Sequence, residues 1–180
     1  MTQDKLIRAC LEGNQKACRD LYDLHKGWLY AICLRYHQNS HDAEDSLQES
    51  FILIYRKLDT FKGEGDFRGW MRKIAVNCIL SSFRKHKLKT EGFTPLKQEA
   101  VDLSLLHELD ANELRFFIQQ LSPGRKQVFI AHAIDGYTHK EIGEMLNISE
   151  GTSKSQFFDA RKELKKSIEK SNNIANKDFV

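Results

Sequence analysis

The stretch that decides the fold is Tyr137–Leu164, "YTHKEIGEMLNISEGTSKSQFFDARKEL", where a helical pattern breaks once, at Asn147. Apolar or small residues recur at every third or fourth position on both sides of the break: Ile142, Met145 and Leu146, then Ser153, Phe157, Ala160 and Leu164. This spacing predicts two helices of about nine and about sixteen residues that bury their stripes against each other. Of the residues other than glycine, Asn adopts the left-handed backbone conformation most readily. The first helix should therefore end at Asn147.

The short connection predicts a helix-turn-helix, in which Gly143 allows a close backbone approach and Ser149 caps the second helix. Six residues should then point outward: Thr152, Lys154, Ser155, Phe158, Asp159 and Lys162. Short polar side chains with cations suit a DNA groove. An exposed aromatic such as Phe158 needs something to cover it. An ordinary helical hairpin remains the alternative.

A second nucleic-acid signal lies in residues 67–89, "FRGWMRKIAVNCILSSFRKHKLK", which hold seven Lys or Arg residues and no acid. A helix of one charge sign repels itself, and it favours a polyanion as partner over a merely solvated face. The aromatics Phe61, Phe67 and Trp70 lie among these cations, as in surfaces that stack single-stranded bases; core packing is the alternative. The glycines of "FKGEG" would let the backbone approach an extruded base.

The preceding segment, "SHDAEDSLQESFILIYRKL", predicts a helix capped by Ser40 or Asp42 and ending near Leu58. One side carries the stripe Leu47, Phe51, Ile54 and Leu58, which should be core. The other side is acidic and also carries Gln48 and Ile52. It is either solvated or a docking surface for a basic protein, and the spacing leaves both open.

Charge divides the chain, whose overall net charge is +3, into a basic part (1–90), an acidic part (91–121) and a second basic part (122–180). With 41% hydrophobic and 29% charged residues and two prolines, the composition predicts an all-α protein of two small helical domains with a flexible linker. A helix from Leu114 to Leu121 should be followed by another that starts with Ser122 as cap and Pro123 as first residue.

Several classes of protein are disfavoured. The chain begins without a signal-peptide pattern and holds no run of about 20 apolar residues, so a cytoplasmic protein without membrane insertion is expected. The four cysteines lack metal-ligand spacing, and no metal, other cofactor or catalytic residue is predicted. His132 and His139 have no carboxylate or cysteine at ligand spacing, so an enzyme has little support.

Residues 42–85 and 121–164 together resemble the extracytoplasmic-function sigma factors of bacterial RNA polymerase. The resemblance implies a region 2 domain (1–90), a linker (91–110), a region 4 domain (111–170) with a winged-helix-like bundle of three to four helices, and a disordered tail (171–180). It implies that the protein binds core RNA polymerase, through its clamp helices and flap, and promoter DNA. An anti-sigma factor is a further implied partner.

The resemblance also implies three sets of contact residues. Those for core polymerase follow the D-x-x-Q-E-x-F motif and are Asp45, Gln48, Glu49, Phe51 and Ile52. Those for the melted minus-ten element are Phe61, Lys62, Gly63, Phe67, Arg68, Trp70, Arg72, Lys73, Asn77, Arg84 and Lys85. Those for the minus-thirty-five element are Thr152, Lys154, Ser155, Gln156, Phe158, Asp159 and Arg161.

Two positions depart from the family pattern, which often has a cation where this chain has Gln156 and Asp159. A carboxylate at 159 would repel phosphate, yet it could accept a hydrogen bond from the cytosine amino group. The first hypothesis is therefore an initiation factor that recruits polymerase to a restricted promoter set. The second is a stand-alone helix-turn-helix regulator, which would leave the basic helix at 67–89 without a purpose.

Overall fold

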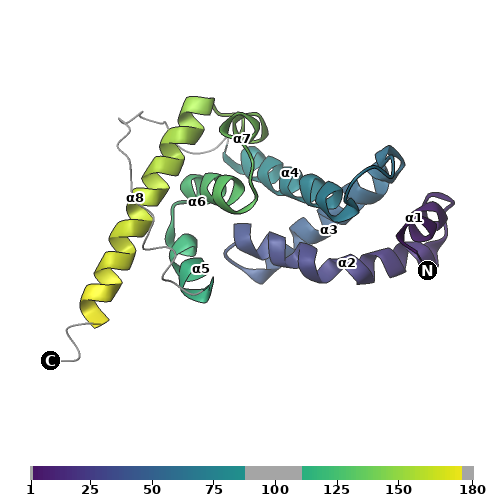
Figure 1. The fold of residues 1–180 in the computed structure, drawn as a ribbon, viewed down its shortest axis with the longest axis horizontal. Helices are drawn as coiled ribbons and strands as arrows, with labels where there is room; N and C mark the ends of the chain where they lie inside the picture. The colour runs from purple at the N-terminus through teal and green to yellow at the C-terminus, as the bar shows by residue number, and fades with distance from the viewer. Residues whose placement is uncertain (1, 88–110, 176–180) are drawn as a thin grey trace. The chain divides into compact units, whose positions relative to one another are not determined.

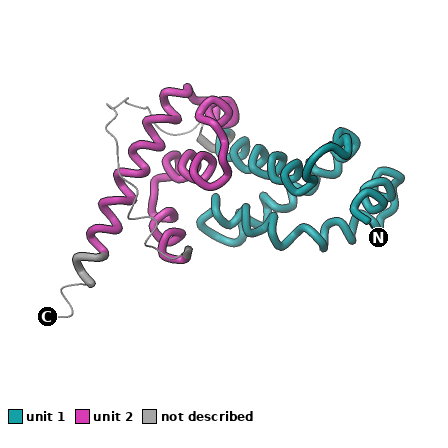
Figure 2. Tube along the Cα trace, viewed as in Figure 1, with its two compact units in different colours: residues 1–85 teal, residues 86–180 magenta. Residues whose placement is uncertain are grey.

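The computed structural model describes residues 2–87 and 111–175, and within these ranges every regular element is a helix. The chain divides into two compact units, residues 1–85 and 86–180 (Figure 2). The predicted all-α class is confirmed. The predicted linker at 91–110 and the tail residues 176–180 lie outside the described residues.

The first unit contains four α-helices: α1 (Gln3–Leu11), α2 (Gln15–Tyr36), α3 (Ser40–Lys57) and α4 (Phe67–Lys87). These helices are labelled in Figure 1, and a 3₁₀ turn, η1 (Leu58–Thr60), follows α3. Asn39 caps α3, because its side chain accepts a hydrogen bond from the Asp42 backbone N–H at 2.8 Å. The prediction of Ser40 or Asp42 as cap is wrong by one to three positions, since Asn39 is the last residue with extended backbone.

The core of the first unit contains the predicted stripe of α3, and Leu47, Phe51, Ile54 and Leu58 are all buried. Opposite them, α4 buries Met71, Ala75, Val76, Ile79 and Leu80. Burying such side chains contributes about 1.5–3 kcal/mol each for the larger aliphatic residues. The buried residues fix which face of each helix is turned to the core. The other residues of α3 and α4 lie on the faces turned away from it.

The second unit contains α5 (Ala111–Gln120), α6 (Pro123–Phe129), α7 (His139–Leu146) and α8 (Glu150–Ala175). A π-helical segment, η3 (Ile130–Ile134), continues α6. Ser122 precedes Pro123 at the start of α6, as predicted, although its side chain makes no capping hydrogen bond. At 26 residues, α8 is longer than predicted and includes residues 171–175 of the expected disordered tail. Its buried stripe continues to Ile168, which explains part of the extension.

The predicted helix-turn-helix is confirmed in α7 and α8. Asn147 has the left-handed backbone expected at the break, with φ 55°. Ser149 caps α8 by accepting a hydrogen bond from the Thr152 backbone N–H at 2.9 Å. A capping box of Thr138 and Glu141 starts α7. These local bonds hold the turn, so the outward face of α8 is presented on a fixed support.

Candidate nucleic-acid interface

An aromatic cluster lies where the loop after η1 enters α4. The Phe61 ring packs against Phe67 at 5.0 Å and Trp70 at 5.5 Å between centroids, and the Phe67 and Trp70 rings are stacked at 5.5 Å. Asp66 starts α4 by accepting hydrogen bonds from the backbone N–H groups of Arg68 and Gly69. The glycines at 63 and 65 have φ of 76° and 82°, so the loop turns sharply just before the cluster.

Phe67 lies inside the first unit, with 1% of its surface exposed. The expectation that it touches DNA is therefore not met by the structure. Its ring faces the core because it is the first residue of α4 and lies one turn before the buried Met71. Phe67 instead supports Trp70 and Phe61, which are both partly exposed.

His25 of α2 supports the same cluster, with its ring 5.7 Å from that of Phe67. The Trp28 indole N–H donates to His25 Nδ1 at 3.1 Å, which leaves the ring proton of neutral His25 on Nε2. Nε2 is buried and makes no hydrogen bond. Burial lowers the pKa of His25, and the nearby Arg68 guanidinium lowers it further. The ring is therefore held neutral beneath the basic surface of α4.

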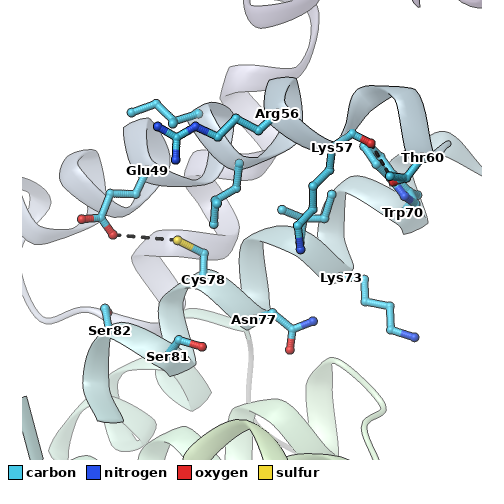
Figure 3. A pocket seen from close by; sticks show the side chains of 13 residues that line it. Glu49, Arg56, Lys57, Thr60, Trp70, Lys73, Asn77, Cys78, Ser81 and Ser82 are labelled. Carbon is cyan, nitrogen blue, oxygen red and sulfur yellow. Dashed lines mark hydrogen bonds between the residues drawn. The ribbon is translucent and has the colours of Figure 1, made fainter. Parts of the chain in front are cut away.

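A groove of about 590 Å³ runs between α3 and α4. Figure 3 shows Lys57 extending from α3 toward α4, with Asn77 and Lys73 on the opposite wall. Its wall residues include three cations, an indole, an amide and one carboxylate. They are Glu49, Ile52, Leu53, Arg56, Lys57, Thr60, Trp70, Lys73, Ile74, Asn77, Cys78, Ser81 and Ser82.

The chemistry of this groove suits a single nucleic-acid strand. Lys57, Lys73 and Arg56 can neutralise phosphates, and Trp70 can stack on a base. The Asn77 amide can both donate to and accept from a base edge. Glu49 is the one acid among the wall residues, and its carboxylate accepts a weak hydrogen bond from the Cys78 thiol at 3.8 Å. A polyanion fits this net positive charge.

Arg56, Lys57 and Thr60 are among the wall residues that the sequence reasoning missed. Arg56 and Lys57 end α3, where they read as ordinary C-terminal cations. Their closeness in sequence to the loop at 61–66 is the signal that could have found them. Among the predicted minus-ten residues, Arg68, Arg72, Lys73 and Arg84 are exposed; the side chain of Lys85 lies outside the described residues.

The predicted core-polymerase residues separate into a surface set and one buried residue. Asp45, Gln48, Glu49 and Ile52 are exposed along α3, and Ile52 exposes 50% of its surface. Phe51 is buried, with its ring 4.6 Å from that of Tyr22. The motif therefore combines an exposed acidic strip with an anchoring core aromatic, and a surface contact by Phe51 is not supported.

Three residues of α8 that were expected to point outward or to contact the minus-thirty-five element, Ser155, Gln156 and Asp159, face the interior of the unit instead. Lys154 and Lys162 are exposed as expected, whereas Phe158 is only partly exposed. The expectation that Ser155 points outward is wrong: it is 6% exposed, and its hydroxyl turns back to donate to the Thr152 carbonyl oxygen. Gln156 is also buried, and its amide lies against Gly124 of α6.

Asp159 is the third difference, because its carboxylate already has a partner within the unit. Arg125 of α6 donates to Asp159 at 3.3 Å, and only 15% of the aspartate side chain is exposed. A neighbour 34 residues earlier in the chain leaves no trace in local spacing. Arg161 is partly exposed and lies 5.7 Å from the Phe157 ring.

Within residues 2–87 and 111–175, no cluster of three or more His, Cys, Asp or Glu side chains could hold a metal ion. In the same ranges, each helix is too short or too polar to cross a membrane.

The family models and the relatives that match this chain are all sigma factors. Residues 21–89 match the family model of Sigma-70 region 2, and residues 111–164 match that of Sigma-70, region 4. The chain is 34% identical to the ECF RNA polymerase sigma factor SigW of Bacillus subtilis, over 91% of this chain and 95% of SigW. It is 26% identical to the ECF RNA polymerase sigma-E factor of Haemophilus influenzae, over 94% of this chain and 96% of the relative.

Among solved structures, the chain is similar to CnrH, determined in complex with the cytosolic domain of CnrY. The likeness covers 91% of this chain and 95% of CnrH, with 20% identity and a TM-score of 0.49.

Proposed function

The chain belongs to the extracytoplasmic-function sigma factors of RNA polymerase, and from this premise we infer that it directs core polymerase to a restricted set of promoters. It acts as an alternative transcription initiation factor in the cytoplasm and performs no catalysis of its own. The polymerase carries out RNA synthesis, and this protein supplies recognition and strand capture. An anti-sigma factor as regulatory partner is part of the proposal and rests on family membership.

The groove between α3 and α4 is the observation that carries this proposal. Its three cations, Trp70 and Asn77 suit a single strand, and a stand-alone regulator of duplex DNA has no use for such a surface. Its rim also includes Glu49 and Ile52 of the exposed strip on α3. The surfaces proposed for polymerase and for melted DNA are therefore neighbours on one rigid unit.

We assign the contacts as follows. Asp45, Gln48, Glu49 and Ile52 meet the polymerase clamp helices, with Phe51 as their anchor. Trp70, Lys73 and Asn77, with the cations of α4 and the loop residues Phe61, Lys62 and Gly63, hold the melted minus-ten strand, and Phe67 supports them. Thr152, Lys154 and Phe158 of α8 read the minus-thirty-five duplex, with Arg161 at the margin of that surface. The flap contact belongs to the second unit.

The first test concerns polymerase binding by α3. Asp45→Lys should lower the affinity for core RNA polymerase by at least about tenfold, because it reverses one of the two negative charges of the exposed strip. Co-elution of the full chain with core enzyme measures this. Glu44→Lys is the matched control, since Glu44 is exposed on the same helix but outside the motif. Equal loss in both variants, or a full chain that never binds core yet shifts duplex DNA, would contradict the sigma-factor function.

The second test concerns strand capture in the groove. Lys73→Ala and Asn77→Ala should each reduce promoter opening about tenfold while leaving core binding unchanged, since each removes a strand contact. Permanganate reactivity of the promoter thymines in the holoenzyme complex measures opening. Lys5→Ala removes an exposed lysine from α1 and should open promoters normally. Unchanged opening in the Lys73 and Asn77 variants would remove the groove from the mechanism.

A further inference from the structure

Arg125 of α6 holds two carboxylates that lie one turn apart on α8. Its Nη1 is 2.8 Å from Glu163 Oε2, and its Nη2 is 3.3 Å from Asp159 Oδ2. One guanidinium therefore serves two acids, and its planar fork suits such a double contact. The Arg125 side chain is 38% exposed and that of Glu163 is 37% exposed, so the cluster lies at the surface rather than in the core.

The location of these acids matters for DNA binding. Asp159 is the only acid between residues 151 and 162, the segment that contains the proposed minus-thirty-five surface. It directly follows Phe158, and Glu163 directly follows Lys162. A bare carboxylate at either place would face the negative charge of the DNA backbone and weaken binding. Judged from the sequence alone, these two carboxylates should weaken the binding of α8 to DNA.

We propose that Arg125 is a positioning residue for minus-thirty-five recognition, a role that rests on the proposed function. Its guanidinium offsets the charges of Asp159 and Glu163 and holds the Asp159 carboxylate against α6. The neighbouring Lys154 and Phe158 can then meet the duplex without a repelling group beside them. Arg125 acts through these two acids and makes no contact with a base.

In this role Arg125 affects DNA affinity more than folding. The Arg125–Glu163 pair is partly exposed and contributes little to stability, whereas the Asp159 side chain is only 15% exposed and loses its partner in Arg125→Ala. The variant should therefore melt at a lower temperature than the unmodified chain but remain folded at the temperature of the binding assay. The same change should weaken binding to duplex promoter DNA on the order of tenfold, because it exposes two like charges to the phosphates. Arg115→Ala is the matched control: Arg115 is exposed on α5, in the same unit, and its loss changes the net charge equally.

Two charge-matched double variants decide the mechanism. Both Arg125→Ala/Asp159→Asn and Arg125→Ala/Glu169→Gln restore the net charge, but only the first removes an acid that Arg125 held. Glu169 lies further along α8, where it is 3.9 Å from Lys165. The first double variant should bind within about twofold to threefold of the unmodified chain, since one stranded acid remains. The second should stay as weak as Arg125→Ala.

The probe is a set of duplex promoter fragments selected by the unmodified chain with core polymerase. Binding is measured with the holoenzyme and also with the full chain alone, so that a failure to bind core is seen separately and does not hide the result. If Arg125→Ala binds like Arg115→Ala, the proposal is wrong. Equal rescue by both double variants would mean that only net charge matters, and no rescue would mean that Arg125 itself contacts DNA. Either result would overturn it.

Discussion

At the scale of single residues, Gly143 and Asn147 set the angle between the two helices of the helix-turn-helix. A Cβ atom at position 143 would lie 2.8 Å from the Ile148 carbonyl oxygen and 3.5 Å from the Glu150 backbone nitrogen. Backbone atoms cannot move aside as a flexible side chain can, so the turn passes over α7 only because residue 143 is glycine. Both positions could be predicted from the sequence, because the turn requires a close backbone approach at Gly143 and a left-handed residue at Asn147.

Gly143→Ala should therefore destabilise the folded chain by about 1–3 kcal/mol, the cost of forcing a methyl group into a packed contact. Urea unfolding of the full chain, followed by circular dichroism, measures the change. Gly151→Ala is the control, because its Cβ would lie 3.6 Å from the Ser149 hydroxyl, an ordinary contact, in the first turn of α8. That variant should be neutral or up to about 1 kcal/mol more stable. If both variants are equally stable, the turn does not pack closely enough on Gly143 to exclude a methyl group there.

At the scale of elements, helical spacing predicted the buried stripes of α3, α7 and α8, except that Met145 and Phe157 are only half-buried. It did not predict what each outward residue contacts. Phe67 and Trp70 are both aromatic and three residues apart, yet one is core and the other lines the groove. Asp159 looked free because its partner lies on α6. Such contacts depend on how helices pack, and one sequence holds no signal for them.

A second contact of this kind joins η3, α7 and α8. The rings of His132 and His139 are stacked at 4.1 Å, and Phe157 packs edge-on against His132. His132 hydrogen-bonds the Tyr137 carbonyl oxygen at 2.7 Å, and His139 meets the Ser153 hydroxyl at 3.0 Å. Burial lowers the pKa of His139, and His132 and Lys154 lower it further, against an opposing effect of Glu150.

Acid should therefore destabilise this junction. Because the folded pKa of His139 lies below its ordinary value of about 6.5, the unfolded chain binds the proton more readily. The stabilisation is complete above about pH 6.5 and is lost as the pH falls through the folded pKa. Thermal melts between about pH 7.5 and 5 should show a smaller decline for His139→Gln than for His41→Gln, whose ring is exposed. If both variants lose thermal stability equally as the pH falls, His139 does not cause the loss of stability in acid.

At the scale of the whole molecule, the two surfaces proposed to bind promoter DNA lie on different compact units of the chain. The groove of the first unit is lined by residues of α3, η1 and α4, and α8 packs against α5, α6 and α7 of the second unit. No residue of one proposed surface serves in the other. One chain carries both, so binding at either site raises the effective concentration of the second site at the same DNA molecule.

The two surfaces should therefore contribute independently to promoter binding. Lys73→Ala in the groove and Lys154→Ala on α8 remove cations from different units, and each should weaken holoenzyme binding to a promoter about threefold to tenfold at low salt. The free-energy losses should add in the double variant to within about 0.5 kcal/mol, as for sites that share no partner. Competition binding at fixed ionic strength gives the promoter affinities of the unmodified chain, the two single variants and the double variant. A coupling above about 1 kcal/mol would mean that the units act on DNA as one body, and the division of labour between them would have to be abandoned.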